Sequence, residues 1–201
     1  MHADEPGAPA DPAIVDQGPP LRRLFLLALA GGVLGFLAES VHLQAGVWAL
    51  RPGAAFPWWI TLVYFFGLAG AGRLFHGVEC RAGRRLSVSR RALAFEITLF
   101  LLLFFAPIVL HRFEIGLAVL VTGILALRLV RFRVPGDVQV AILALTIDLV
   151  AESTLVGFGM YRYPEAHWLP LPLWLAPFWG ALGLGLRRFF VVALGASPGK
   201  S

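Results

Sequence analysis

The sequence predicts an all-α, polytopic membrane protein with six transmembrane helices. Of its 201 residues, 58% are hydrophobic and only 14% are charged, whereas a soluble domain carries about 25% charged residues. A helix needs about 20 mainly apolar residues to cross the hydrocarbon core of a bilayer. Six such stretches follow one another with short loops, and they occupy nearly all of the chain after Pro20.

The predicted helices cover residues 21–44, 57–76, 90–110, 114–130, 138–159 and 171–193. We expect Pro107 to kink the third helix or to end it early, because proline cannot donate a backbone hydrogen bond. Residues 21–193 therefore form one transmembrane domain. Residues 1–20 are rich in Pro, Ala, Gly and acids and predict a disordered N-terminal tail, and residues 194–201 predict a short C-terminal tail.

The basic residues predict the orientation of the helices. With these six spans, 14 of the 17 Lys and Arg residues fall on one side, and only Arg51, Arg112 and Arg162 fall on the other. Loops rich in Lys and Arg face the cytoplasm, so we expect both tails there and a bacterial inner membrane as the location. The net charge of +5 is thus a topology signal, and no nucleic-acid partner is expected.

The first and last helical hairpins, helices 1–2 and helices 5–6, resemble each other in sequence. Ala38-Glu39-Ser40 recurs 113 residues later as Ala151-Glu152-Ser153, and a glycine-led loop follows each copy. Pro57-Trp58-Trp59-Ile60 is echoed by Pro172-Leu173-Trp174-Leu175. An offset of four helices preserves orientation, so the repeat predicts two parallel hairpins around a pseudo-twofold axis.

Acidic residues inside apolar spans are the candidate functional residues, because an acid in a bilayer usually has a partner or a role. Asp148 and Glu152 lie four residues apart on one helix face, where two carboxylates in a low dielectric would not both ionise readily. A protonated carboxyl there could act as a general acid, which makes Asp148, Glu152 and Glu39 the catalytic candidates if the protein is an enzyme.

A structural role is the alternative for each acid. Glu39 and Glu152 lie near loops, where they could bond to loop backbone or to Trp48 and Tyr161; for Asp148 the two roles are evenly balanced. We expect Glu96 to pair with the nearby arginines at the start of its helix. No histidines or cysteines have metal-ligand spacing, and no cofactor motif occurs.

Aromatic residues gather at the predicted outer ends of the helices. Most are expected to form an interfacial belt, and some to line a mouth through which a lipid enters. With the acids they give the predicted lipid-binding residues, which are Glu39, Trp48, Trp59, Asp148, Glu152, Tyr161, Tyr163 and Trp174.

The last hairpin resembles the Insig (insulin-induced gene) family. Gly159-Met160-Tyr161-Arg162-Tyr163, Trp168-Leu169-Pro170 and the later Gly183-x-Gly185 are similar to the end of those proteins, and Trp58-Trp59 resembles their second span. The resemblance implies a six-helix bundle that binds a sterol-like or diacylglycerol-like lipid, or an isoprenoid, in a cavity. It also implies a membrane-protein partner and a homo-oligomer, either a trimer or a dimer.

A second resemblance is to small membrane carotenoid cyclases and hydratases, which have similar aromatic loops and repeated units. It implies protonation of a polyene by intramembrane carboxylates. The Pro-x-Glu-Glu motif of those enzymes is absent, since this chain has Pro57-Trp58-Trp59 and Pro172-Leu173-Trp174 in its place. The sequence therefore favours a lipid-binding or isoprenoid-binding protein, with an isoprenoid-modifying enzyme as the alternative.

Overall fold

A computed structural model describes residues 21–54, 57–82, 88–166 and 169–194. The predicted tails, apart from Leu194, lie outside these residues, and so does Trp168. The described elements are α2 (Leu21–Gln44), β1 (Ala49–Leu50), α3 (Ile60–Ala82), α4 (Arg90–Leu110), α5 (Glu114–Arg131), α6 (Asp137–Gly157), β2 (Tyr161–Arg162) and α7 (Leu175–Ala193). The predicted all-α class and its six helices are confirmed.

Most predicted helix bounds agree with the structure to within a few residues. The main difference is α3, which begins at Ile60 and continues to Ala82 instead of ending at residue 76. The early end expected at Pro107 is wrong, because α4 runs on to Leu110. Pro107 lies in the last turn, where its missing N–H costs a single intrahelical hydrogen bond, and its carbonyl accepts from the His111 N–H at 3.0 Å.

Four of the helices, α2, α4, α6 and α7, are each long and apolar enough to cross a membrane. The other two carry more polar residues. α5 has only 18 residues and includes Glu114, Arg128 and Arg131, while α3 carries Arg73 and His76 among its glycines. Glu114 and Arg128 are buried inside the protein, so two of the three charges on α5 do not face lipid.

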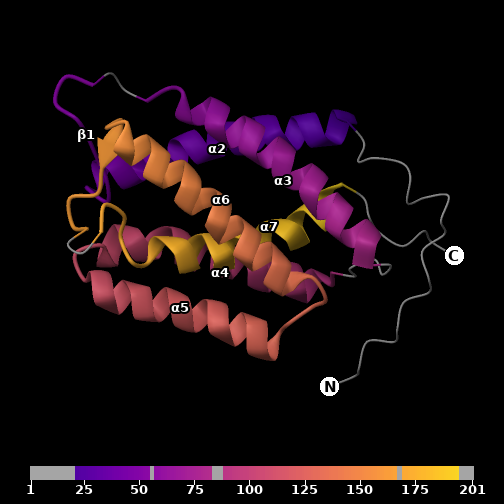
Figure 1. Cartoon of the computed structure of the whole chain (residues 1–201). Coiled ribbons are helices and arrows are strands. Elements are labelled where there is room, and N and C mark those ends of the chain that lie inside the picture. The colour runs from indigo at the N-terminus through magenta and orange to yellow at the C-terminus, as the bar shows by residue number, and fades with distance from the viewer. Residues whose placement is uncertain (1–20, 55–56, 83–87, 167–168, 195–201) are drawn as a thin grey trace, which may run out of the picture.

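Helix α7 is the central element of the bundle. It contacts α3, α4, α5 and α6, and its buried residues occur on all sides of the helix. Small residues permit this close packing: a Cβ added at Gly183 would lie 2.5 Å from the Cβ of Ala144 on α6. In Figure 1, α2 and α3 lie side by side along one edge of the bundle, and α5 lies along the other.

The two resembling hairpins meet at one end of the bundle through their loops. β1 and β2 pair in antiparallel fashion, with Ala49 opposite Arg162, and these two positions are 113 residues apart. Gly46 and Gly159 have the same offset and both have positive φ, 77° and 69°, which glycine adopts without steric cost. Residues 113 positions apart thus face each other where the two loops pair.

The opposite end of the bundle contains a buried network of charged side chains, here called the ionic network. Arg187, only 1% exposed, donates from Nε to Glu79 at 2.7 Å, from Nη1 to Asp137 at 2.8 Å and from Nη2 to the Pro135 carbonyl at 2.8 Å. Arg188 donates to the second oxygen of Asp137 at 3.0 Å. The network therefore joins α3, the start of α6 and α7.

The same network extends to Glu96, for which the expected partner was wrong. We expected Arg90 or Arg91, but both carboxylate oxygens of Glu96 accept from Nη2 of Arg128 at 2.8 Å. Nη1 of Arg128 donates to the Ala181 carbonyl on α7 at 2.9 Å. Sequence spacing on one helix could not show this pairing, because α4, α5 and α7 come together only in the folded bundle.

Replacing Arg187 with methionine should strongly destabilise the protein. The change removes the bonds that Arg187 donates to Glu79, Asp137 and the Pro135 carbonyl, and breaking a buried ion pair costs about 3–5 kcal/mol. Thermal unfolding in detergent, followed by circular dichroism, should show a much lower Tm. Arg112→Gln, at an exposed arginine, is the control and should melt with the wild type. An Arg187→Met protein that melts with that control would contradict the role of the network.

Candidate functional site

Three acidic side chains from the two hairpins come together near the paired loops. Glu39 lies in the last turns of α2, while Asp148 and Glu152 lie one turn apart on α6. Asp148 interacts electrostatically with both Glu152 and Glu39, and Glu152 also interacts with Glu39. The structure thus brings all three catalytic candidates into one region, here called the acid cluster.

Both oxygens of Glu39 accept hydrogen bonds from aromatic side chains. Trp48 Nε1 donates to Oε2 at 2.9 Å, and the Tyr64 hydroxyl donates to Oε1 at 2.5 Å. His42 Nδ1 lies 3.7 Å from Oε2, and its other ring nitrogen lies 3.1 Å from the Phe104 carbonyl. The bond to Trp48 was expected, whereas Tyr64 was missed.

Glu152 is held in the same way by the second loop. The Tyr161 hydroxyl donates to Oε2, and the Tyr163 hydroxyl donates to the same oxygen at 2.9 Å. Burial, together with the neighbouring Glu152, raises the pKa of both phenols well above its ordinary value. Both hydroxyls therefore keep their protons and remain donors to the carboxylate.

Asp148 differs from the two glutamates in its hydrogen bonding. Its side chain lies in the middle of α6 and is only 9% exposed. Within the described part of the chain, its Oδ2 is the one buried side-chain oxygen or nitrogen that has no hydrogen-bond partner. An unsatisfied buried polar atom costs about 1–3 kcal/mol, so Asp148 is the member of the cluster that a ligand would satisfy.

Aromatic rings surround these acids in a continuous series of contacts, here called the aromatic chain. Neighbouring ring centroids lie 5.2 to 6.4 Å apart, within the usual range for aromatic pairs. The order is Trp48, Tyr161, Tyr163, Trp174, Phe178, Trp179 and Tyr64. Trp48 and Tyr64 both donate to Glu39, so this carboxylate closes the series.

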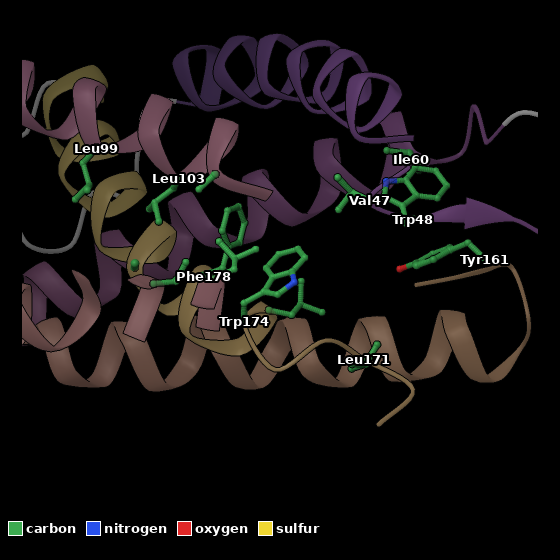
Figure 2. Close-up of a cluster of buried hydrophobic side chains, with 14 residues drawn as sticks. Val47, Trp48, Ile60, Leu99, Leu103, Tyr161, Leu171, Trp174 and Phe178 are labelled. Carbon is green, nitrogen blue, oxygen red and sulfur yellow. The ribbon is translucent and has the colours of Figure 1, made fainter. Parts of the chain in front are cut away.

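The expected interfacial belt is wrong for the most important of these aromatics. Trp48, Tyr161 and Trp174 are 4%, 6% and 4% exposed and belong to the core cluster in Figure 2. Trp59 packs against that core and is partly buried. Trp58, at 66% exposed, does have the exposure of a belt residue. Pairing of the two loops explains the difference, because it turns the other rings toward each other.

Three residues of the aromatic chain were not predicted from the sequence, and they are Tyr64, Phe178 and Trp179. One signal was available for Tyr64, since it is the only tyrosine within a predicted apolar span. Tyr64 and Trp179 also occupy matching places after Pro57 and Pro172, and their rings contact each other at 6.4 Å. The resemblance of the two hairpins could therefore have indicated Tyr64 and Trp179 as a pair. The apolar sequence of the helices alone does not show which equivalent residues contact each other.

Two small hollows flank the acid cluster. One is lined by Glu39 and Trp48 and the other by Tyr163 and Trp174, and the larger has a cavity volume of only about 10 Å³. Pockets that enclose drug-sized ligands measure about 300–1,000 Å³. The described residues therefore do not form the lipid cavity that the Insig resemblance implies.

The geometry limits the chemistry of each acid. Glu39 and Glu152 each accept hydrogen bonds from aromatic side chains of their own loop or a neighbouring helix, so their hydrogen bonds are made within the protein. Among the described residues, no three His, Cys, Asp or Glu side chains are placed to hold a metal ion. The cluster is therefore suited to binding a hydrogen-bond donor or a cation, and Asp148 is the available contact.

Replacing Gly35 with alanine should disturb the Glu39 side of the cluster. A Cβ at Gly35 would lie 2.4 Å from the Tyr64 ring, so the ring must move away from Glu39. We expect a loss of about 1–3 kcal/mol from overpacking. Gly67→Ala is the matched control on a neighbouring helix, because nothing lies within 4 Å of its added Cβ. Thermal unfolding of both variants in detergent measures the difference, and equal melting would contradict this packing.

Comparison with solved structures identifies a similar fold. The mycobacterial Insig homologue MvINS from Mycobacterium vanbaalenii superposes with a TM-score of 0.70, covering 90% of this chain and 98% of that one at 16% identity. A cross-linked MvINS trimer gives the same values. No family model and no curated protein matches the sequence. The chain is a multi-pass membrane protein with an Insig-like fold.

Proposed function

We propose that the protein binds a membrane lipid or an isoprenoid through the polar group of that molecule, which contacts the acid cluster. The observation that carries this proposal is the buried Oδ2 of Asp148, which has no hydrogen-bond partner among the described residues. Buried polar groups are nearly always satisfied. A ligand group that donates a hydrogen bond would satisfy this oxygen, and the bilayer is the immediate source of such molecules.

The apolar part of the ligand would lie against the lipid-facing surface of the bundle. The hollows beside the cluster are too small for such a chain, whereas α6 exposes Ile147 and Val150 next to Asp148, at 55% and 62%. On the first hairpin, Leu37 next to Glu39 is 53% exposed. Acyl or isoprenoid chains can pack there without opening the bundle, because those side chains already face the bilayer.

A retained lipid is the direct test of this proposal. Native mass spectrometry of protein extracted in a mild detergent should show an added lipid mass on the wild type. Asp148→Asn should lose most of that adduct, since the amide offers an uncharged contact and a competing donor. Asp16→Asn is the matched control, because it makes the same change in the predicted N-terminal tail. Wild-type protein without any lipid adduct would overturn the proposal.

We also propose a homo-oligomer, by analogy with the cross-linked trimer of MvINS, and an orientation with both ends of the chain in the cytoplasm of a bacterial inner membrane. The orientation rests on the Lys and Arg bias of the sequence. The trimer would appear as a threefold mass in the same spectra.

Reporter fusions in a bacterial host test the orientation. Green fluorescent protein joined after Ser201 should fluoresce, because that end is proposed to be cytoplasmic. Alkaline phosphatase joined after Gly53, in the loop that follows β1, should be active because that loop is proposed to face the periplasm. The reverse pattern would refute this orientation.

A further inference from the structure

We infer that the acid cluster selects an amphiphile with a cationic head group, and that a primary ammonium is the group that fits it best. This inference rests on the proposed lipid-binding function and specifies the chemistry of the ligand. It depends on three features of the described residues. They are a cluster of three acids whose hydrogen-bond donors carry no charge, an acid that only one hairpin carries, and the aromatic rings around it.

The first feature is the charge balance. The hydrogen bonds made to Glu39 and Glu152 come from an indole and from phenols, which are neutral donors and bring no positive charge. Among the described residues, the basic side chain recorded beside Glu39 is His42, at 3.7 Å. Arg51, Arg112 and Arg162, the arginines of this end, are exposed. An ionised carboxylate in a low dielectric is costly, and a cation bound beside these acids would favour their ionised forms and pair with them.

The second feature is that Asp148 is specific to the second hairpin. Its equivalent in the first hairpin, 113 residues earlier, is Gly35, against which the Tyr64 ring packs. The hairpin therefore folds without an acid at this position. Glu39 and Glu152, in contrast, occupy equivalent positions and bond to equivalent loop aromatics, Trp48 and Tyr161. The shared acids support the loops, whereas the added acid has no internal partner at Oδ2.

The third feature is the aromatic chain. Aromatic faces attract cations, most strongly when the cation is removed from water. An ammonium group also carries three N–H donors, which can be divided between Asp148 Oδ2 and neighbouring acceptors. A bare metal ion is less suitable, because the described acids are not placed as a set of metal ligands. An alcohol brings a single donor and no charge, so it should bind more weakly.

Matched probes with the same alkyl chain test this inference. Dodecylammonium and 1-dodecanol can each be added to the detergent-solubilised full chain at pH 7, with bound probe counted by native mass spectrometry and checked by the shift in Tm. Wild-type protein should bind dodecylammonium at least tenfold more tightly than 1-dodecanol. Asp148→Asn should lose this preference, whereas Asp148→Glu and the control Asp16→Asn should keep it.

The outcomes separate this inference from the proposed function. Equal binding of both probes, or tighter binding of the alcohol, would overturn the cationic ligand and leave lipid binding intact. Binding of neither probe, together with the absence of any native lipid adduct, would overturn both. An amine preference that persists in a folded Asp148→Asn protein would also overturn the assignment. Folding of this variant is checked by its Tm, which should not fall, because Asp148 Oδ2 has no bond to lose.

Discussion

The interaction on which the rest of the structure depends is the buried ion pair between Arg187 on α7 and Asp137 at the start of α6, at 2.8 Å. Both side chains are 1% exposed, so neither charge can be left alone without a large desolvation cost. Glu79 on α3 and Arg188 complete the arrangement. Because several helices contribute to it, the network sets the register of α7 within the bundle.

The buried acids at the two ends of the bundle have different kinds of hydrogen-bond donors. In the ionic network, guanidinium groups contact carboxylates and backbone carbonyls, and each buried acid there has a charged or backbone donor. In the acid cluster, the hydrogen bonds to Glu39 and Glu152 come from phenols and an indole, and Asp148 Oδ2 has no partner among the described residues. A stability role explains the first end well, since its groups are satisfied. At the second end, Asp148 Oδ2 lacks a hydrogen-bond partner among the described residues, and the candidate site is placed there for this reason.

The repeat explains how such a cluster can form from apolar helices. Two parallel hairpins meet through β1 and β2, with residue 49 opposite residue 162. Pairing at these equivalent positions brings Trp48 onto Tyr161, with ring centroids 5.2 Å apart, and carries one glutamate from each hairpin to the same region. The two hairpins also differ at Asp148, because the first hairpin has Gly35 at that position. Glu39 and Glu152 thus hold the loops of the two hairpins in similar ways, whereas Asp148 has no counterpart in the first hairpin.

Much of the fold could be predicted because it is local in the sequence. Runs of apolar residues predict helices such as 21–44 and 90–110. In a bilayer such a run forms a helix, because its backbone hydrogen-bonding groups must be satisfied within the segment. The acids Glu39, Asp148 and Glu152 also stand out, since charge is rare in such runs. The partner of Glu96 was missed for the opposite reason, because Arg128 approaches it from another helix.

The sequence by itself determined the six helices, the resemblance of the two hairpins and the identity of the unusual acids, because each depends on hydropathy or spacing along one chain. Only the tertiary structure decided which acids are satisfied. Glu39 accepts a hydrogen bond from Tyr64 on α3, and Glu152 accepts hydrogen bonds from two tyrosines of its loop. Asp148 Oδ2 has no partner among the described residues. The physical reason is that hydrogen bonds and ion pairs require approach within about 3 Å, and helix packing sets such distances between residues far apart in sequence.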